Sequence, residues 1–260
     1  MLMNSHPPKK LIVGNWKMNT TIAEGSLLFN RLRKELGDYT NCDVVLCPPY
    51  THLFALHREL ADEAKKSSFK LGVQNISEHE EGSYTGEISA SMIKNLASYV
   101  IVGHSERRKY FAETDRTDGQ KLALALRHNL KPILCVGETQ DQRQEGHAKQ
   151  IVLDQINTAL SGVTEEELHN LAIAYEPVWA IGSGNFAKPA LVEEMILLIR
   201  NTLAQTYGRL GSMKVRVLYG GSVESDNAKT FLGLQGVDGL LVGGASLNSQ
   251  KFAAIVKATN

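Results

Sequence analysis

The sequence predicts an α/β protein built as a single (β/α)8 barrel, and three observations support this prediction. Short apolar runs rich in β-branched residues recur eight times along the 260 residues, and longer amphipathic stretches separate them. The runs are spaced by roughly 30 residues, which is about the length of one βαβ unit. Eight such units in about 250 residues are typical of a (β/α)8 barrel, whereas a doubly wound sheet usually has about five or six strands.

Predicted strands and helices alternate along the whole chain. Ile22, Leu28 and Leu32 fall on one face of a predicted helix, as expected for a helix that covers a sheet. No linker rich in proline, glycine or serine divides the chain, so we expect one domain over residues 1–260, with residues 1–9 as a flexible N-terminal extension. The predicted strands are 11–16, 44–47, 71–75, 99–102, 132–136, 171–175, 215–219 and 239–242.

The balance of charges argues against some classes of partner. Lysine plus arginine and aspartate plus glutamate both total 28, so no overall positive field is available to hold a nucleic acid or an anionic membrane surface. No stretch approaches the ~20 apolar residues of a spanning helix, and the first ten residues lack the apolar region of a signal peptide. We therefore expect a cytoplasmic protein that binds neither membranes nor nucleic acids.

The cysteines and histidines predict free thiols and no metal site. Cys42, Cys47 and Cys135 form no CxxC pair, which is typical of unpaired cysteines in a reducing compartment. His-x-His and HExxH spacings are absent from the sequence.

Polar residues follow the first predicted strand, at the end where barrels of this kind carry their chemistry. Period-two alternation puts Asn15 and Lys17 on the same side of the chain as Val13. If Val13 faces the barrel interior, both side chains line the mouth. The alternative is a solvated loop lysine beside an asparagine that forms a turn.

A histidine and a glutamate follow two other strands. His104 lies in a predicted strand-to-helix turn, where the positive helix end disfavours an imidazolium and a neutral imidazole can donate a hydrogen bond to a carbonyl oxygen. Glu176 precedes Pro177, which holds it extended at the rim, and a carboxylate there can accept a proton. The alternatives are a histidine that only caps the turn and an ordinary rim carboxylate.

The segment after Glu176 has the composition of a lid. It is apolar at its tip and glycine-rich beyond, and an exposed apolar loop is costly unless it closes onto something. The predicted lid residues are Pro177, Val178, Trp179, Ala180, Ile181, Gly182, Ser183 and Gly184.

Glycine pairs follow the last two predicted strands. Gly220 and Gly221 precede Ser222, and Gly243 and Gly244 follow the eighth strand. Bare backbone amides at this position bind phosphate in barrels of this kind. Close helix packing is the alternative reading of these pairs.

Four segments closely resemble the triosephosphate isomerase family, and the resemblance covers residues 10–258. They are the stretches 14–19, 102–108, 174–182 and 219–223. The resemblance implies a TIM barrel in glycolysis and gluconeogenesis that converts a triose phosphate without metal or organic cofactor. It implies these roles: Glu176 as base, His104 as electrophile, Lys17 as a cation near the substrate, Asn15 as an orienting amide, Glu106 as a carboxylate near Lys17, and Gly182, Ser183, Gly220, Ser222, Gly243 and Gly244 as substrate or phosphate contacts.

The resemblance also implies a homodimer. The long polar stretch after the third strand looks like the family's interdigitating loop, with Thr85 approaching the partner's active site. The residues expected there are Gln74, Tyr84, Thr85, Gly86 and Glu87. One departure from the family is local: Asn185 and Phe186 replace the small or basic residues commoner at the far lid hinge.

Two other kinds of function compete with this interpretation. Another sugar-phosphate barrel, such as a Schiff-base aldolase or an isomerase of aromatic amino-acid synthesis, would use the same fold, and an aldolase would need Lys17 as its reactive amine. A catalytically silent scaffold barrel would not need Glu176, His104 and Lys17 together.

Overall fold

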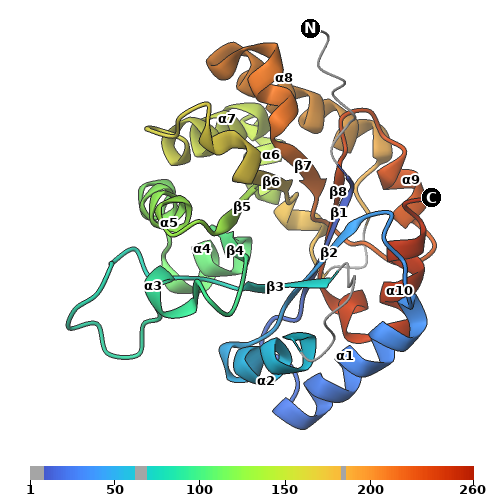
Figure 1. Ribbon diagram of the computed structural model, residues 1–260. Coiled ribbons are helices and arrows are strands. Elements are labelled where there is room, and N and C mark those ends of the chain that lie inside the picture. The colour runs from blue at the N-terminus through green and yellow to red at the C-terminus, as the bar shows by residue number, and fades with distance from the viewer. Residues whose placement is uncertain (1–8, 62–68, 183–185) are drawn as a thin grey trace, which may run out of the picture.

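The computed structural model describes residues 9–61, 69–182 and 186–260 of the chain. Its strands form a closed barrel in the order β1 to β8, and each strand is parallel to its neighbours. Helices surround the barrel on the outside (Figure 1). The predicted (β/α)8 barrel is therefore confirmed. The expected N-terminal extension lies, except for Lys9, outside the described residues.

The strands agree closely with the sequence prediction. Seven of the eight end within one residue of the predicted bounds, whereas β3 begins and ends two residues earlier than predicted. They are β1 (Leu11–Asn15), β2 (Asp43–Cys47), β3 (Phe69–Val73), β4 (Tyr99–Val102), β5 (Lys131–Val136), β6 (Ala172–Tyr175), β7 (Arg216–Tyr219) and β8 (Gly239–Val242).

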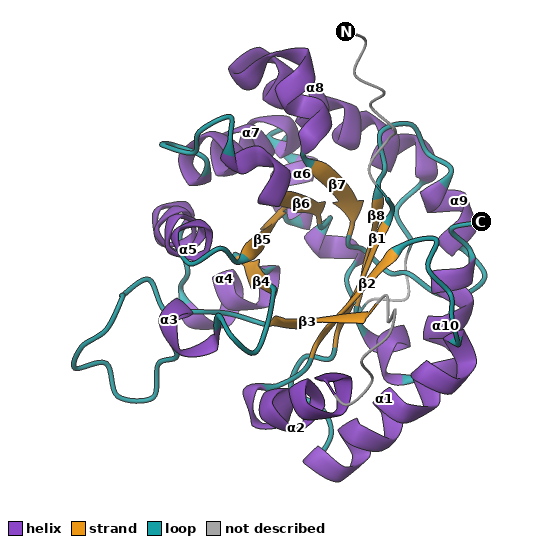
Figure 2. Ribbon diagram, viewed as in Figure 1, coloured by secondary structure: helices purple, strands orange, loops and turns teal. Residues whose placement is uncertain are grey.

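Helices of different lengths follow the strands (Figure 2). The α-helices are α1 (Ile22–Leu36), α2 (Tyr50–Ala61), α3 (Ala90–Ile93), α4 (Ser105–Phe111), α5 (Asp115–Arg127), α6 (Gln140–Gln144), α7 (Ala148–Ala159), α8 (Pro189–Lys214), α9 (Ala228–Leu232) and α10 (Ser249–Lys257). Short 3-10 helices are η1 (Glu167–Asn170), η2 (Val178–Ala180) and η3 (Gly244–Leu247).

Helix α1 shows how one covering helix begins and packs. The Thr21 side chain accepts from the Glu24 amide, and Glu24 in turn accepts from the Thr21 amide, so two free N–H groups of the first turn are satisfied. Leu28 and Leu32 are buried as predicted. Ile22, the first residue of the helix, is half exposed, so its predicted packing was wrong.

Side chains on each strand alternate between the barrel interior and the layer under the helices. Leu11 and Val13 belong to the interior cluster, whereas Ile12 between them packs in the outer cluster. Ala172 and Ala174 of β6 also face the interior. The same alternation carries the next residues on these faces to the carboxyl-terminal mouth of the barrel.

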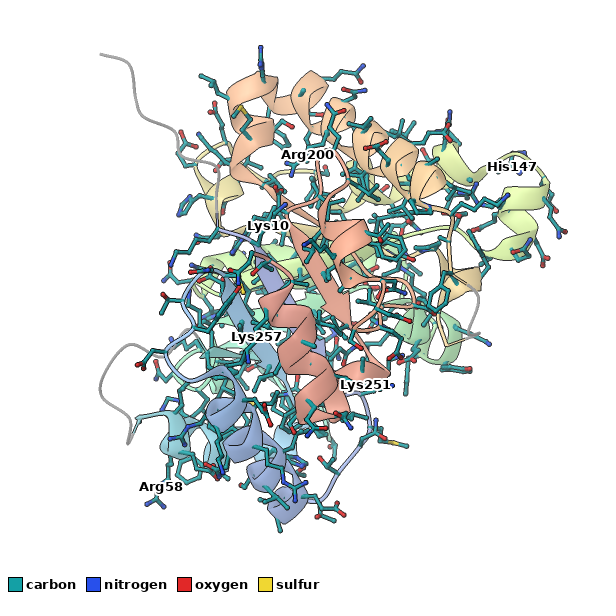
Figure 3. The ribbon with its side chains drawn as sticks, turned by 90° about the vertical axis from the view of Figure 1, so that its right-hand side faces the viewer. Lys10, Arg58, His147, Arg200, Lys251 and Lys257 are labelled. Carbon is teal, nitrogen blue, oxygen red and sulfur yellow. The ribbon has the colours of Figure 1, made fainter. Side chains whose placement is uncertain are left out.

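The opposite end of the barrel is held by Arg200 of α8 (Figure 3). Its guanidinium donates to the carbonyl oxygens of Ser212, Val215 and Gly236 at 2.9, 2.6 and 3.1 Å. It also pairs with Asp238, which directly precedes β8. This contact network joins the segments that enter β7 and β8.

The polar connection from β3 to α3 projects from the body of the barrel (Figure 1). Residues 80–87 are all exposed. His79 and Tyr84 stack their rings, with centroids 3.8 Å apart and planes 5° from parallel. The loop therefore has local order although the rest of this chain hardly covers it.

Two arrangements are missing from the described part of the chain. None of its helices is both long and apolar enough to cross a membrane. Within residues 9–61, 69–182 and 186–260, no three histidine, cysteine, aspartate or glutamate side chains are grouped to hold a metal ion.

The buried cysteines give the first testable prediction. Burial raises the pKa of the Cys42 thiol to about 11 and moves the pKa values of Cys47 and Cys135 upward as well, so little thiolate forms at pH 8. We expect all three thiols to react with an aromatic disulfide reagent only as the protein unfolds. A native-state reaction as fast as that of free cysteine would contradict this packing.

Candidate active site

A cavity of about 310 Å³ opens at the carboxyl-terminal mouth of the barrel. It brings together groups that are up to 230 residues apart in the chain, from Asn15 to Ala245. Its lining includes nine of the residues predicted as catalytic or as substrate and phosphate contacts: Asn15, Lys17, His104, Glu176, Gly182, Gly220, Ser222, Gly243 and Gly244.

The turn after β1 is held by its own side chains. The Asn15 side-chain oxygen accepts from the Lys17 amide at 3.0 Å, and Gln74 donates to the Lys17 carbonyl oxygen at 2.8 Å. These bonds stabilise Lys17 at a φ of 53°, which is uncommon for a residue with a side chain. Asn15 and Lys17 therefore line the mouth, as the position of Val13 inside the barrel requires.

Lys17 reaches across the mouth to a carboxylate from another loop. Its ammonium lies 2.6 Å from Oε1 of Glu106, and a Cβ added to Gly243 would lie 3.3 Å from Lys17 Cε. The other oxygen of Glu106 is 3.6 Å from Nδ1 of His104. Glu106 thus joins Lys17 to the histidine turn, although it does not line the cavity.

His104 caps the amino-terminal end of α4. Its Nδ1 accepts from the Glu106 amide at 3.2 Å, which requires Nδ1 to be unprotonated. The ring proton is therefore on Nε2, which lies 3.2 Å from Oε1 of Glu176. We infer from these contacts a neutral histidine whose N–H lies at the cavity floor, the state that the sequence analysis expects.

Glu176 directly follows β6 and continues the inward face of Ala172 and Ala174. It is 2% exposed, and its second oxygen accepts from the Ser105 amide at 3.3 Å. Burial raises the pKa of its carboxyl, but His104, the Ser105 amide and Lys17 outweigh burial, so the pKa lies below its ordinary value. Glu176 is therefore ionised at neutral pH and buried, unlike an ordinary rim carboxylate, so it is able to accept a proton.

Opposing influences act on the protonation of His104. Burial lowers the pKa of the imidazole, and the carboxylates of Glu176 and Glu106 raise it, with a net rise above its ordinary value. The Glu106 amide and the positive end of α4 oppose the added proton, because both face Nδ1. We infer that the imidazole is neutral, because its Nδ1 accepts a hydrogen bond and therefore carries no proton in this arrangement.

The first part of the predicted lid is packed in this structure. Val178, Trp179 and Ala180 form η2, and Trp179 Nε1 donates to Glu138 Oε1 at 2.8 Å. The Ser222 hydroxyl donates to the Ala180 carbonyl oxygen. The apolar tip is therefore buried or half-buried and not exposed. The lid residues Ser183 and Gly184 lie outside the described residues.

Glu138 was not predicted from the sequence. It is fully buried, and it accepts from the Tyr175 hydroxyl at 3.1 Å and from Arg143 Nε at 2.7 Å, in addition to Trp179. It follows β5 by two residues, so the strand-end rule that found the other residues would have found it too. Glu224 also lines the cavity and was likewise not predicted, and Phe186, which the sequence marked only as a departure at the far lid hinge, lines it too.

The residues expected in the dimer loop lie apart from the cavity of their own chain. Tyr84, Thr85, Gly86 and Glu87 are exposed and do not line it. Gln74, at the start of the loop, instead bonds to the carbonyl oxygens of Lys17 and Cys47 and so supports the cavity wall.

Together, the closed barrel and the ionised carboxylate beside a neutral histidine define a (β/α)8-barrel enzyme with acid–base chemistry at the carboxyl-terminal mouth.

Comparison with known proteins identifies the family. A family described as Triosephosphate isomerase matches residues 10–259. The chain is 47% identical over 249 residues to the triosephosphate isomerase of Caldanaerobacter subterraneus subsp. tengcongensis, covering 95% of this chain and 98% of that protein. It is 43% identical to that of Dictyoglomus turgidum, covering 96% and 99%, and 44% identical to that of Chloroflexus aurantiacus, covering 95% and 97%. The chain belongs to the triosephosphate isomerase family and is an isomerase, of the class of intramolecular oxidoreductases.

Gly220 gives a test of how tightly Glu176 must be held. A Cβ at Gly220 would lie 2.9 Å from Glu176 Cγ, so Gly220→Ala displaces the carboxylate. We expect kcat/KM for isomerisation to fall by about 100-fold, because a small misplacement of a reacting group has a large cost. Gly233→Ala is the control, since its Cβ would meet nothing closer than 3.4 Å. Equal activity of the two variants would contradict the prediction.

Proposed function

We propose that the cavity interconverts D-glyceraldehyde 3-phosphate and dihydroxyacetone phosphate by proton transfer through an enediolate. The observation that carries this proposal is the buried contact of Glu176 Oε1 with His104 Nε2 at 3.2 Å, next to the Lys17 ammonium. It joins an ionised base to a neutral hydrogen-bond donor at one point of a cavity large enough for a small substrate. Membership of the family supports the same reaction.

The proposed chemistry assigns one step to each group. Glu176 removes a proton from the carbon next to the substrate carbonyl and returns it to the neighbouring carbon. His104 donates its Nε2 hydrogen to the substrate oxygens, and Lys17 stabilises the negative charge that develops on them. Asn15 orients the same oxygens, and Glu106 holds the Lys17 ammonium in place by the 2.6 Å contact. The reaction as proposed uses no metal or organic cofactor.

We assign the phosphate to the side of the cavity formed by the glycine pairs. Gly220 and Ser222 lie on one segment, and Gly243 and Gly244 lie on the next. A Cβ added to Gly244 would meet nothing within 4 Å, so the backbone faces open space there. Backbone amides can approach an anion closely in such a place. Gly182 lines the same cavity, and Ser183 completes the proposed contacts.

The residues from Pro177 to Gly184 are the proposed lid. The enediolate phosphate can eliminate its phosphate in water, so a closing segment has a chemical purpose, which is to exclude solvent. Ser222 holds Ala180, and Glu138 holds Trp179. Movement of the proposed lid would break these two hydrogen bonds and form others in their place.

The geometry does not favour a Schiff-base aldolase. An amine that attacks a carbonyl must be desolvated and neutral. The Lys17 amine instead contacts the Glu106 carboxylate at 2.6 Å, and its side chain is 27% exposed. No borohydride-trapped adduct on Lys17 is therefore expected.

We also propose that the protein acts as a homodimer with one domain in each subunit, in the cytoplasm, within glycolysis and gluconeogenesis. The projecting loop and several exposed apolar side chains support the dimer. Met18, Met92 and Phe111 are 96%, 61% and 64% exposed. Phe111 and Tyr84 border one hollow beneath the loop, and Gln74 connects the loop to the turn that carries Met18. Thr85 at the loop tip would reach the partner's cavity.

The base is tested by Glu176→Gln. This change keeps the shape but removes the group that accepts the proton, so we expect kcat to fall by about 10²–10⁴-fold. Initial rates of conversion in both directions provide the measurement, with Glu166→Gln on the exposed surface as the matched control. An inactive unmodified protein, or a Glu176→Gln variant with full activity, would contradict the proposed reaction.

The dimer is tested by placing a charge on the apolar surface. Met92→Glu buries an unpaired carboxylate if the dimer forms there, so the variant should sediment as a monomer under conditions where the unmodified protein is a dimer. Leu210→Glu on α8, at another exposed apolar residue, is the control and should remain dimeric. A fully active monomer of the unmodified protein would refute the proposal.

A further inference from the structure

A carboxyl group outside the cavity is buried behind the histidine turn. Asp118 lies in the first turn of α5 and is 0% exposed. Neither of its oxygens has a hydrogen-bond partner among the described residues. Buried carboxyl groups normally accept hydrogen bonds, so one that accepts none calls for an explanation. Nothing in the proposed reaction uses it directly.

The nearest cation to Asp118 is Arg108 of α4. Arg108 Nη2 lies 2.7 Å from Asp118 Oδ2, and Nη1 pairs with Asp115, which is one-third exposed. Arg108 Nε donates to the Gly103 carbonyl oxygen at 2.8 Å. The guanidinium therefore joins two carboxylates of α5 to the peptide group that immediately precedes His104.

Gly103 is packed directly against this pair. Its φ is 70°, and a Cβ there would lie 2.6 Å from Asp118 Oδ2 and 3.1 Å from Arg108 Nη2. Only glycine fits this combination of backbone conformation and close approach. The Asp118 carboxyl and the Arg108 guanidinium thus form the wall behind the turn that carries His104.

The environment of Asp118 is charged on several sides. Burial raises the pKa of its carboxyl, Arg108 lowers it and Glu113 raises it again, so that the pKa reaches about 7. Cys135 is subject to the charges of both Asp118 and Glu176, so the carboxyl acts electrostatically on the same region as the base. The groups that face Asp118 are Arg108 from α4, Glu113 from the turn between α4 and α5, Asp115 and Lys121 from α5, and Cys135 from β5.

We propose that Asp118 is a positioning residue for the isomerase reaction: its ionised carboxylate holds Arg108 against Gly103 and thereby fixes the turn that aims His104. When the carboxylate takes up a proton from solvent, Arg108 loses its buried counter-charge and keeps only the partly exposed Asp115. The turn is then less firmly held and turnover falls. This inference rests on the proposed function and adds a group that never touches the substrate.

The first experiment measures kcat of the unmodified protein and of Asp118→Asn between pH 5.5 and 9. Asparagine imitates the protonated carboxyl, so the ratio of the two kcat values should be near 1 at the acid end. It should rise to about threefold at the alkaline end, because a loosely held catalytic group slows the reaction. The ratio cancels the titration of the substrate phosphate. At each pH the two proteins should have the same KM, since Asp118 does not line the cavity.

The matched control is Asp115→Asn. It removes the other carboxylate from the same guanidinium but leaves the buried group in place. Its own kcat should therefore still rise with pH as in the unmodified protein. If kcat of Asp115→Asn no longer rose with pH, the pH dependence would belong to the ion pairs of Arg108 in general, and the specific role of Asp118 would be overturned.

Thermal unfolding gives a second readout. The pKa of Asp118 is about 7 in the folded protein, whereas an unfolded aspartate has a pKa near ~3.9. Between these two pH values the folded protein binds a proton that the unfolded chain does not, so its stability falls as the pH rises from about 4 to about 7. The Tm of Asp118→Asn relative to the unmodified protein should therefore increase from pH 4 to about 7 and then level off. A difference that does not change with pH would contradict the buried titration.

Arg108→Lys tests the same contact from the other side. Lysine keeps the charge but cannot reach the Gly103 oxygen and Asp118 together. At pH 8.5, kcat of Arg108→Lys should therefore fall about threefold, as in Asp118→Asn, and the rise of kcat with pH that Asp118 causes should be absent. An unmodified protein without isomerase activity would refute the proposed function. An active protein whose kcat ratio to Asp118→Asn is constant with pH would overturn the positioning role alone.

Discussion

Closure of the sheet is the constraint on which the rest of this structure depends. Eight parallel strands in one barrel have all their carboxyl ends at one rim, and alternation along each strand sends every second side chain toward the axis. Val13 and Ala174 fill the interior, and Asn15 and Glu176, two residues further on, therefore meet at the mouth. The interior below them is packed with side chains, so the cavity has a rigid floor.

On that floor the decisive interaction is between a buried carboxylate and a neutral imidazole. Glu176 remains ionised because a donor ring, a backbone amide and a lysine offset its desolvation. His104 remains neutral because the Glu106 amide faces its Nδ1. Glu176 depends on His104, Ser105 and Lys17, which come from other loops, whereas His104 depends on an amide of its own turn. Acid–base chemistry at this site is thus a property of several strand ends acting together.

The sequence predicted correctly the features that depend on neighbouring residues, and it was less accurate for features that depend on contacts between distant segments. Asn15 and Lys17 were predicted because alternation is a local rule, and the position of Val13 inside the barrel obeys it. The prediction for β3 was shifted by two residues: Gln74, counted as strand, lies beyond the last paired residue, and its side chain donates to the carbonyl oxygens of Lys17 and Cys47. Ile22 was assigned to the packed face by periodicity, which does not say how much of the first turn of a helix is covered.

The sequence by itself determined the barrel and the order of its elements, through the number and spacing of its apolar runs. It also indicated the polar residues and glycines that follow β1, β4, β6, β7 and β8, because these are local patterns within about ten residues. Only the tertiary structure decided that Glu138 binds Trp179 and that Asp118 and Arg108 support Gly103. Those contacts join residues from separate elements, and their charges interact strongly because they are buried. Burial arises only when the whole barrel is assembled, so no single segment of the chain predicts it.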